Sequence, residues 1–133
     1  VVAAKPNLVI LAFGMNDSAG RSADSYQENT TKMIAAIREQ LPECEFILVA
    51  SMLGNRNWIR LKHEAFPQYR DKLSELTKPG IALADLTAIW TGFLNLKQDW
   101  DQTGNGVNHP NDFGHRVYAQ AITALLEPAV PEK

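Results

Sequence analysis

Three short, uninterrupted apolar segments constrain the fold of this chain more than any other feature of its sequence. They occupy residues 7–13, 45–51 and, less clearly, 81–85, and the first two contain both Val and Ile. A segment of this length without polar alternation is typical of a strand buried on both faces, as in a parallel sheet. We therefore expect three parallel strands.

A helix is predicted between the first two strands. Apolar side chains recur at spacings of three and four over residues 26–41, which places them on one face of a helix. Ser22 or Asp24 can cap its start, and Pro42 stands just beyond its end. An amphipathic helix therefore covers one face of the predicted sheet.

Three further helices are predicted after the second strand. Residues 58–77 show a helical apolar pattern in which Pro67 is expected to break or kink the helix. Residues 86–96 form a third helix, and residues 111–126 carry the clearest apolar stripe. This order predicts a single α/β domain over residues 1–133, with a parallel sheet flanked by helices on both faces.

Charge and hydropathy exclude several classes of partner. The formal charge of −2 and the pI of about 5.9 lack the excess of basic residues expected of a protein that binds nucleic acid. The longest apolar segments are far shorter than the roughly 20 residues that span a bilayer. We expect neither a nucleic-acid partner nor a membrane span.

Metal and nucleotide sites are not indicated. The spacing of His109, Asp112 and His115 does not match the helical pair of histidines at i and i+4 that binds zinc. The chain also lacks the glycine-rich phosphate-binding motifs of nucleotide-dependent proteins. No metal or cofactor is predicted.

The first candidate for chemistry is the polar stretch at residues 14–17, directly after the first predicted strand. In a parallel sheet, sites form at the carboxyl ends of the strands. The amide of Asn16 can donate hydrogen bonds to a developing oxyanion, and Gly14 lets the backbone approach a ligand closely. The alternative is an Asn-Asp turn that only caps the next segment.

The second candidate is His109, which lies in a loop containing glycine and asparagine before the last helix. Pro110 restricts the loop there, and Asn111 or Asp112 can cap the helix. An imidazole with an ordinary pKa near 6.5 can take and return a proton at neutral pH, which suits a general base. The alternative is a histidine bonded to nearby backbone at the helix entry.

The two remaining histidines are interpreted as structural. His115 falls inside the last predicted helix, and His63 is interpreted as a surface residue of the second.

Taken together, residues 6–17 and 108–115 resemble two sequence blocks of the SGNH hydrolases, also called GDSL esterases and lipases. Residues 14–17 match the Gly-x-Asn-Asp that ends a strand in the third block. His109 and Pro110 match the fifth block, in which the catalytic histidine precedes proline and a final helix. The resemblance implies a flavodoxin-like, three-layer α/β/α fold and the hydrolysis of carboxylic esters.

The resemblance also implies roles for individual residues. Asn16 matches the side-chain oxyanion donor, and His109 matches the general base. Gly14 and Asn108 are expected at the substrate-binding surface, and Asp101 is the expected acid of the triad.

The acid is a departure from the family pattern. The family usually has an aspartate three residues before the histidine, where this chain has Gly106. Asp101 would have to fold back across the loop to reach His109, and Asn105, Asn108 or a backbone carbonyl are alternatives for holding the imidazole. Without a carboxylate there, the site would act through a Ser-His dyad.

The nucleophile block is a second departure. The family's first block, a strand ending in Gly-Asp-Ser, has no counterpart among the five serines, Ser18, Ser22, Ser25, Ser51 and Ser74. The resemblance places that block, and the first strands of the fold, upstream of residue 1. The strand at residues 8–13 would then expose a hydrophobic edge, which a companion amino-terminal segment or a second copy of the chain would cover.

Two functions follow as hypotheses. The first is a hydrolase that acts on small-molecule or carbohydrate esters. The second is a non-catalytic binding or interaction module derived from such a hydrolase, in which Trp58, Trp90 and Trp100 could line a binding surface.

Overall fold

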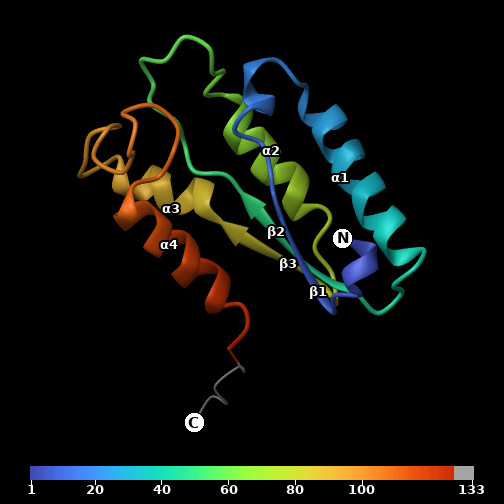
Figure 1. The fold of residues 1–133 in the computed structure, drawn as a ribbon. Helices are drawn as coiled ribbons and strands as arrows, with labels where there is room; N and C mark the ends of the chain where they lie inside the picture. The colour runs from blue at the N-terminus through green and yellow to red at the C-terminus, as the bar shows by residue number, and fades with distance from the viewer. Residues whose placement is uncertain (128–133) are drawn as a thin grey trace.

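The computed structural model describes residues 1–127, in which parallel strands form one sheet flanked by helices (Figure 1). The strands are β1 (Leu8–Ala12), β2 (Glu45–Ala50) and β3 (Ile81–Asp85), and they lie in the order β1-β2-β3. Both neighbouring pairs are parallel. The α/β fold with a parallel sheet is therefore confirmed, and each strand lies inside a predicted apolar segment; residues 128–133 of the predicted domain lie outside the described part.

Four α-helices and two short 3-10 helices complete the described part of the chain. Their bounds are η1 (Val2–Ala4), η2 (Asp17–Ala19), α1 (Ala23–Arg38), α2 (Ala65–Ser74), α3 (Leu86–Phe93) and α4 (Asp112–Thr123).

Side chains of β2 alternate between two hydrophobic clusters. Phe46, Leu48 and Ala50 pack toward α1 and α2, whereas Ile47 and Val49 pack toward Trp90 of α3 and toward α4. Figure 1 shows α1 and α2 on one side of the sheet and α4 on the other. This alternation explains the uninterrupted apolar sequence of β2, since both faces of the strand are buried.

Helix α1 begins where the sequence offers a side-chain cap. Ser22 is the N-cap, and its hydroxyl accepts a hydrogen bond of 3.2 Å from the Ser25 N–H. Of the two predicted capping residues, the structure thus uses Ser22. The helix buries Tyr26, Thr30, Ile34 and Ile37, one face of the predicted helix.

Helix α2 is shorter than the predicted helix at residues 58–77. It begins at Ala65, so Pro67 lies in its first turn. Proline is tolerated there because its missing N–H would have no partner within the helix. The expected break at Pro67 is therefore wrong, and His63 lies in the turn before the helix and not on its surface.

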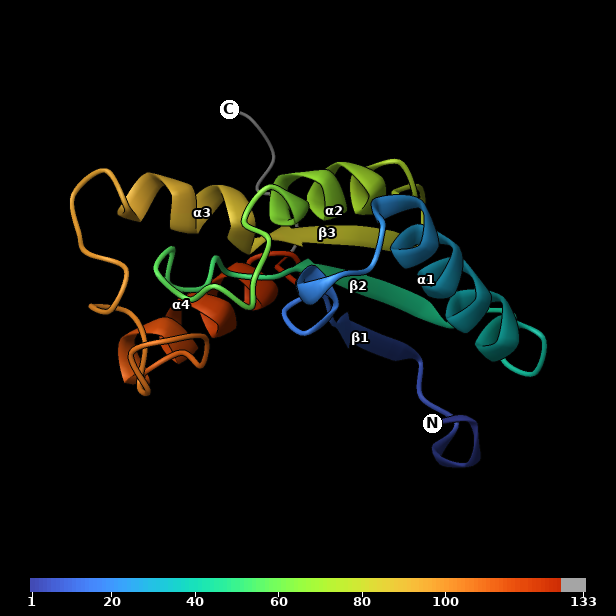
Figure 2. The same ribbon diagram turned by 90° about the horizontal axis from the view of Figure 1, so that it is seen from above.

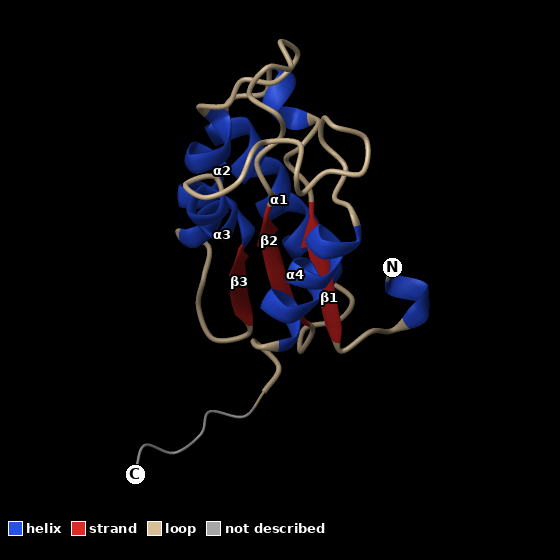
Figure 3. Ribbon diagram, turned by 90° about the vertical axis from the view of Figure 1, so that its left-hand side faces the viewer, coloured by secondary structure: helices blue, strands red, loops and turns tan. Residues whose placement is uncertain are grey.

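Strand β1 forms one edge of the described sheet. It pairs with β2 alone, and Figures 2 and 3 show β1 at the margin of the sheet. Ile10 is 46% exposed and Phe13, just beyond the strand, is 52% exposed. The expectation of an exposed hydrophobic edge at this strand agrees with the structure.

Candidate active site

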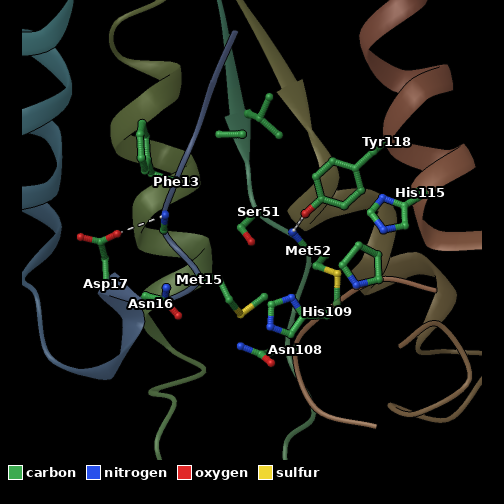
Figure 4. Close-up of a pocket in the computed structure, with 14 residues that line it drawn as sticks. Phe13, Met15, Asn16, Asp17, Ser51, Met52, Asn108, His109, His115 and Tyr118 are labelled. Carbon is green, nitrogen blue, oxygen red and sulfur yellow. Dashed lines mark hydrogen bonds between the residues drawn. The ribbon is translucent and has the colours of Figure 1, made fainter. Parts of the chain in front are cut away.

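A cavity of about 340 Å³ lies where the carboxyl ends of β1 and β2 meet the entry to α4 (Figure 4). It is lined by Ala12, Phe13, Gly14, Met15, Asn16, Asp17, Val49, Ser51, Met52, Asn108, His109, Pro110, His115 and Tyr118. Asn16 and His109, predicted from opposite ends of the chain, therefore line one cavity, as do Gly14 and Asn108. The location agrees with the general position of sites in parallel α/β sheets.

The loop after β1 is held by its own hydrogen bonds. Gly14 has a φ of +112°, a conformation that side-chain-bearing residues rarely adopt, and its N–H donates to Asp17 Oδ2 at 3.2 Å. The Ser18 hydroxyl, fully buried, donates to the Met15 carbonyl at 2.7 Å. Met15 and Asn16 thus sit in a short loop that is fixed at both ends.

Asn16 itself keeps its side chain free. It stands at the N-cap of η2 but makes no capping hydrogen bond, and its side chain is exposed. The alternative of a turn-capping asparagine does not describe this arrangement, because Asp17 provides the local side-chain contact instead. Both N–H groups of the Asn16 amide remain available to a ligand in the cavity.

Two stacked tyrosines support this loop from the helices behind it. The rings of Tyr26 in α1 and Tyr69 in α2 stack with centroids 4.3 Å apart. The Tyr69 hydroxyl lies 2.9 Å from the Asp17 carbonyl and 2.6 Å from the Arg21 carbonyl, and the Tyr26 hydroxyl donates to the Phe13 carbonyl at 3.3 Å. Burial raises the pKa of both phenols, so they remain protonated donors.

Replacing Tyr69 with phenylalanine is expected to loosen the loop that carries Asn16. The change removes the single O–H donor that the Asp17 and Arg21 carbonyls share and should lower the free energy of unfolding by about 1–2 kcal/mol. Urea denaturation measures the loss, and hydrogen exchange should show faster exchange of the amides at residues 14–21. Tyr26→Phe removes only the longer contact and should have a smaller effect; unchanged exchange in Tyr69→Phe would contradict the assigned support.

The loop before α4 is organised by one asparagine that the sequence interpretation gave a different role. Asn105 Oδ1 accepts from the backbone N–H groups of Val107, Asn108 and His109 at 3.0, 3.0 and 3.1 Å. Its Nδ2 donates to Asn108 Oδ1 at 3.0 Å. Asn105 therefore shapes the backbone around His109 and does not hold the imidazole, whose ring is left exposed to the cavity.

Asn111, and not Asp112, caps α4. Its Oδ1 accepts from the Gly114 N–H at 3.0 Å, and its Nδ2 donates to the Asp101 carbonyl at 2.8 Å. Position 114 requires glycine, because a Cβ there would lie 2.7 Å from the Cβ of Pro110. The start of α4 and the segment holding His109 are thus packed tightly together.

Removing this cap is expected to destabilise the His109 segment. Asn111→Ala should lower the free energy of unfolding by about 1–2 kcal/mol, because it removes both the cap and the link to the 101 carbonyl. Asn111→Asp retains an acceptor for the Gly114 N–H but loses the donor, so it should recover about half or more of that loss. Thermal or urea unfolding measures both; equal stability of Asn111→Ala and the unsubstituted chain would exclude the capping role.

Asp101 does not reach His109 in this structure. Its carboxylate accepts from the Gln98 N–H at 2.9 Å, and the side chain is exposed and outside the cavity lining. Within residues 1–127, no hydrogen bond joins it to the imidazole. The expected contact across the loop is absent because both side chains bond locally. Asn105 accepts from the His109 N–H, and the Asp101 carboxylate accepts from the Gln98 N–H.

Three lining residues were not assigned to the site from sequence. The Tyr118 hydroxyl accepts from the Met52 N–H at 2.8 Å and so ties α4 to the end of β2, and burial raises the pKa of its phenol. His115, interpreted as structural, is exposed on α4 and faces the cavity. Ser51, directly after β2, is the one serine among the lining residues.

The tryptophans do not form this site. Trp90 is 1% exposed in the core, and neither Trp58 nor Trp100 lines the cavity. Among residues 1–127, no group of three or more His, Cys, Asp or Glu side chains is arranged to hold a metal ion. No helix of the described chain is long and apolar enough to cross a membrane.

The fold and cavity define a parallel α/β protein with an asparagine and a histidine gathered at the carboxyl ends of its strands. Residues 1–117 match the GDSL-like Lipase/Acylhydrolase family, and the chain belongs to this family. The resemblance inferred from residues 6–17 and 108–115 is thereby confirmed.

Solved structures share the fold at low sequence identity. An acetylxylan esterase, Axe2 from Geobacillus stearothermophilus, in a catalytic mutant form, has a TM-score of 0.76 at 18% identity over 100% of this chain and 65% of its own. A carbohydrate esterase family 3 protein from Talaromyces cellulolyticus has a TM-score of 0.72 at 23% identity, covering 93% of this chain and 58% of its own. A putative GDSL-like lipase from Parabacteroides merdae has a TM-score of 0.76 at 16% identity, covering 92% of this chain and 61% of its own.

This chain thus spans about three-fifths of the length of these structures. No curated protein sequence matches it significantly.

Proposed function

We propose that this chain supplies the general base and an oxyanion donor for the hydrolysis of carboxylic esters. The observation that carries the proposal is the shared cavity of Asn16 and His109, both with side chains free to meet a ligand. Membership of the acylhydrolase family supports the reaction class. Each role requires only what these side chains can provide: a neutral imidazole to accept a proton and an amide to donate hydrogen bonds.

In the proposed mechanism, a serine hydroxyl attacks the ester carbonyl. His109 takes the hydroxyl proton as the new C–O bond forms, and the carbonyl oxygen becomes an oxyanion that accepts from the Asn16 amide. His109 then returns the proton to the leaving alcohol, which leaves an acyl-serine. A water molecule, deprotonated in turn by His109, then attacks the acyl carbon. The bond from this carbon to the serine oxygen breaks as His109 returns the proton to that oxygen, which releases the acid and restores the serine.

We propose that the nucleophile belongs to a Gly-Asp-Ser segment upstream of residue 1. Of the five serines in the chain, Ser18 is fully buried and donates to the Met15 carbonyl, and Ser22 caps α1. Ser51 lines the cavity, but it does not follow a Gly-Asp pair. In this proposal Ser51 forms part of the cavity wall.

The same segment would also cover the open edge of β1. Ile10 and Phe13 are about half exposed, and the outer backbone groups of β1 have no strand beside them in residues 1–127. A companion amino-terminal strand, or a second copy of the chain, would satisfy them. The native mass of the purified sample distinguishes these two cases from a bare monomer of 14.8 kDa, which would count against both.

The proposed substrates are acetyl or other short acyl esters, including esters on carbohydrates. The cavity is small, at about 340 Å³, and its apolar wall of Phe13, Met15 and Met52 suits a short acyl chain. Two of the similar structures are described as an acetylxylan esterase and a carbohydrate esterase, which supports this class.

A fluorophosphonate probe, which labels activated serines, tests the proposal when combined with intact mass spectrometry under denaturing conditions. An adduct on a companion or longer chain supports a serine nucleophile outside residues 1–133. An adduct on the 133-residue chain itself would overturn the assignment of the nucleophile and point to Ser51. No adduct on any chain would favour the non-catalytic binding module.

A further inference from the structure

The segment at residues 53–63 lies between β2 and α2 and has no role in the mechanism above. Figure 1 shows it, in green, at the same end of the molecule as the two loops that carry Asn16 and His109. None of its residues is among those that line the cavity of Asn16 and His109. Any effect of this segment on the reaction must therefore pass through the loops that it contacts.

Within this segment, Asn55 holds the loop of His109 by two of its carbonyls. The Asn55 backbone N–H donates to the Val107 carbonyl at 2.7 Å, and Asn55 Nδ2 donates to the Gly106 carbonyl at 2.8 Å. Asn105 accepts from the N–H groups of the same loop. The loop is thus held through its N–H groups from within and through its carbonyls by a residue distant in sequence.

The remaining polar groups of Asn55 fix the residue in its own turn. Its Oδ1 accepts from the Asn57 N–H at 2.9 Å. Its backbone carbonyl accepts from the Trp58 N–H at 3.0 Å and lies 3.1 Å from His63 Nε2. Only one orientation of the side-chain amide satisfies both of its contacts, because an N–H donates and a carbonyl accepts. The amide of Asn55 is therefore preorganised for the His109 loop.

The same segment is anchored at two further points. Arg56 Nε lies 3.0 Å from both carboxylate oxygens of Asp99, whose side chain is only 7% exposed. At the other end of the segment, the Lys62 N–H donates to the Ser18 carbonyl at 3.0 Å. Ser18 belongs to η2, directly after Asn16 and Asp17. The segment is thus bonded to the loops of both proposed catalytic side chains.

Gly54 shows that this segment also packs against both loops. It is buried, and a Cβ at this position would collide with Leu61 Cδ1. The same Cβ would lie 3.4 Å from the Val107 carbonyl oxygen and 3.6 Å from Met15 Sδ. Met15 directly precedes Asn16, so one position of the segment is close to each loop.

We propose that Asn55 is a positioning residue, which sets the place of the His109 imidazole relative to the Asn16 amide. This inference rests on the proposed function, whose two roles it connects. Within residues 1–127 no hydrogen bond holds the His109 ring, so the position of the ring depends on the backbone that carries it. The 53–63 segment fixes that backbone to the loop of Asn16, and a displacement of about 1 Å is enough to slow a reaction of this kind.

Replacing Asn55 with aspartate tests the Nδ2 contact. Asn55→Asp keeps the size of the side chain and the acceptor for the Asn57 N–H, but it places a carboxylate oxygen opposite the Gly106 carbonyl. In the preparation that the fluorophosphonate probe labels, we expect kcat for 4-nitrophenyl acetate to fall about 10- to 100-fold and KM to change less than about twofold. Asn55→Ala, which also loses the turn contact, should lose at least as much. Asn57→Ala removes an exposed amide from the same turn and should leave both parameters unchanged.

Two further measurements show whether Asn55 acts through His109. In a chain that already carries His109→Ala there is no imidazole to position, so Asn55→Asp should lower the residual kcat by less than about twofold. The ¹⁵N relaxation of the labelled preparation reports on the loop without requiring turnover. The order parameters of the amides at residues 107–109 should fall from about 0.85 toward about 0.6 in Asn55→Asp and stay unchanged in Asn57→Ala. Urea unfolding checks that each variant is folded under the assay conditions.

Three outcomes would overturn the inference. They are a kcat within about twofold of normal in Asn55→Asp, an equal loss of kcat with and without the His109 imidazole, and unchanged order parameters at residues 107–109. Failure of the proposed function gives a different result, in which His109→Ala keeps its turnover or the probe labels no chain. A fall in the order parameters would then show that Asn55 holds the loop, and the catalytic consequence would be excluded together with the function.

Discussion

Replacing His109 with alanine is expected to lower kcat for 4-nitrophenyl acetate by about 10⁴-fold or more in the preparation that the fluorophosphonate probe labels. The serine hydroxyl then has no group to take its proton, and the leaving alcohol has no acid to protonate it. KM should change little, since an activated acetyl ester makes few ground-state contacts with an imidazole. Steady-state kinetics measures both parameters.

Two comparisons make this result specific to the imidazole of His109. The side chain is exposed, so His109→Ala should change the free energy of unfolding by less than about 0.5 kcal/mol, and loss of activity cannot then be attributed to unfolding. His115→Ala removes the other imidazole of the cavity and should lower kcat by less than about tenfold, since the reacting proton does not pass through it. Turnover within tenfold of normal in His109→Ala would exclude the general-base role.

Strand β2 was the most predictable because it is buried on both faces, whereas β1, at the edge of the described sheet, keeps the apolar sequence although Ile10 is 46% exposed. Ile47 and Val49 enter one cluster while Phe46 and Leu48 enter the other, so the sequence of β2 shows no polar residue between its ends. Helix bounds were less predictable. Leu61 is buried in the turns before α2, where it lies against Gly54, and its apolar spacing imitates a helix that the backbone does not form.

Within the candidate site, only residues whose side-chain chemistry itself suggests a role could be predicted from the sequence. Asn16 and His109 could be selected because an amide and an imidazole at strand and helix ends suit acyl transfer. The residues that support them could not be selected. Tyr69 and Tyr118 belong to helices distant in sequence, where they occupy positions of an ordinary apolar stripe, and only the folded arrangement brings their hydroxyls to the Asp17 carbonyl and the Met52 N–H.

The contact expected between Asp101 and His109 shows why contacts within a loop could not be predicted from the sequence. Its spacing from His109 allowed a contact across the glycine-containing loop, but Asn105 accepts three backbone N–H groups at once and gives the loop a different path. Side-chain to backbone hydrogen bonds of this kind compete with longer-range pairing, and composition alone does not reveal which one prevails. The exposed imidazole of His109 therefore has no carboxylate partner within residues 1–127, which favours a Ser-His dyad in the proposed mechanism.

Replacing Asn16 with alanine is expected to lower kcat for the same ester by about 10² to 10³-fold, equivalent to about 3–4 kcal/mol of transition-state stabilisation, with KM nearly unchanged. Only kcat should fall, because the Asn16 amide stabilises negative charge that develops on the oxyanion in the transition state and is absent from the bound ester. The Asn16 side chain makes no capping hydrogen bond, so its loss should not unfold the loop. Asn16→Asp keeps the shape but places a carboxylate beside the oxyanion, so it should be at least as slow as Asn16→Ala. A KM effect without a kcat effect would assign Asn16 to ground-state binding instead.

Combining this change with Tyr69→Phe tests whether the tyrosine acts through Asn16. Tyr69 holds the Asp17 carbonyl, one residue beyond Asn16, so loosening it should lower kcat by misplacing the amide. Once Asn16 is alanine there is no amide to misplace, and Tyr69→Phe should then reduce kcat by less than about twofold, whereas independent roles would give effects that multiply. Multiplying effects would show that the tyrosine pair stabilises the loop without positioning the oxyanion donor.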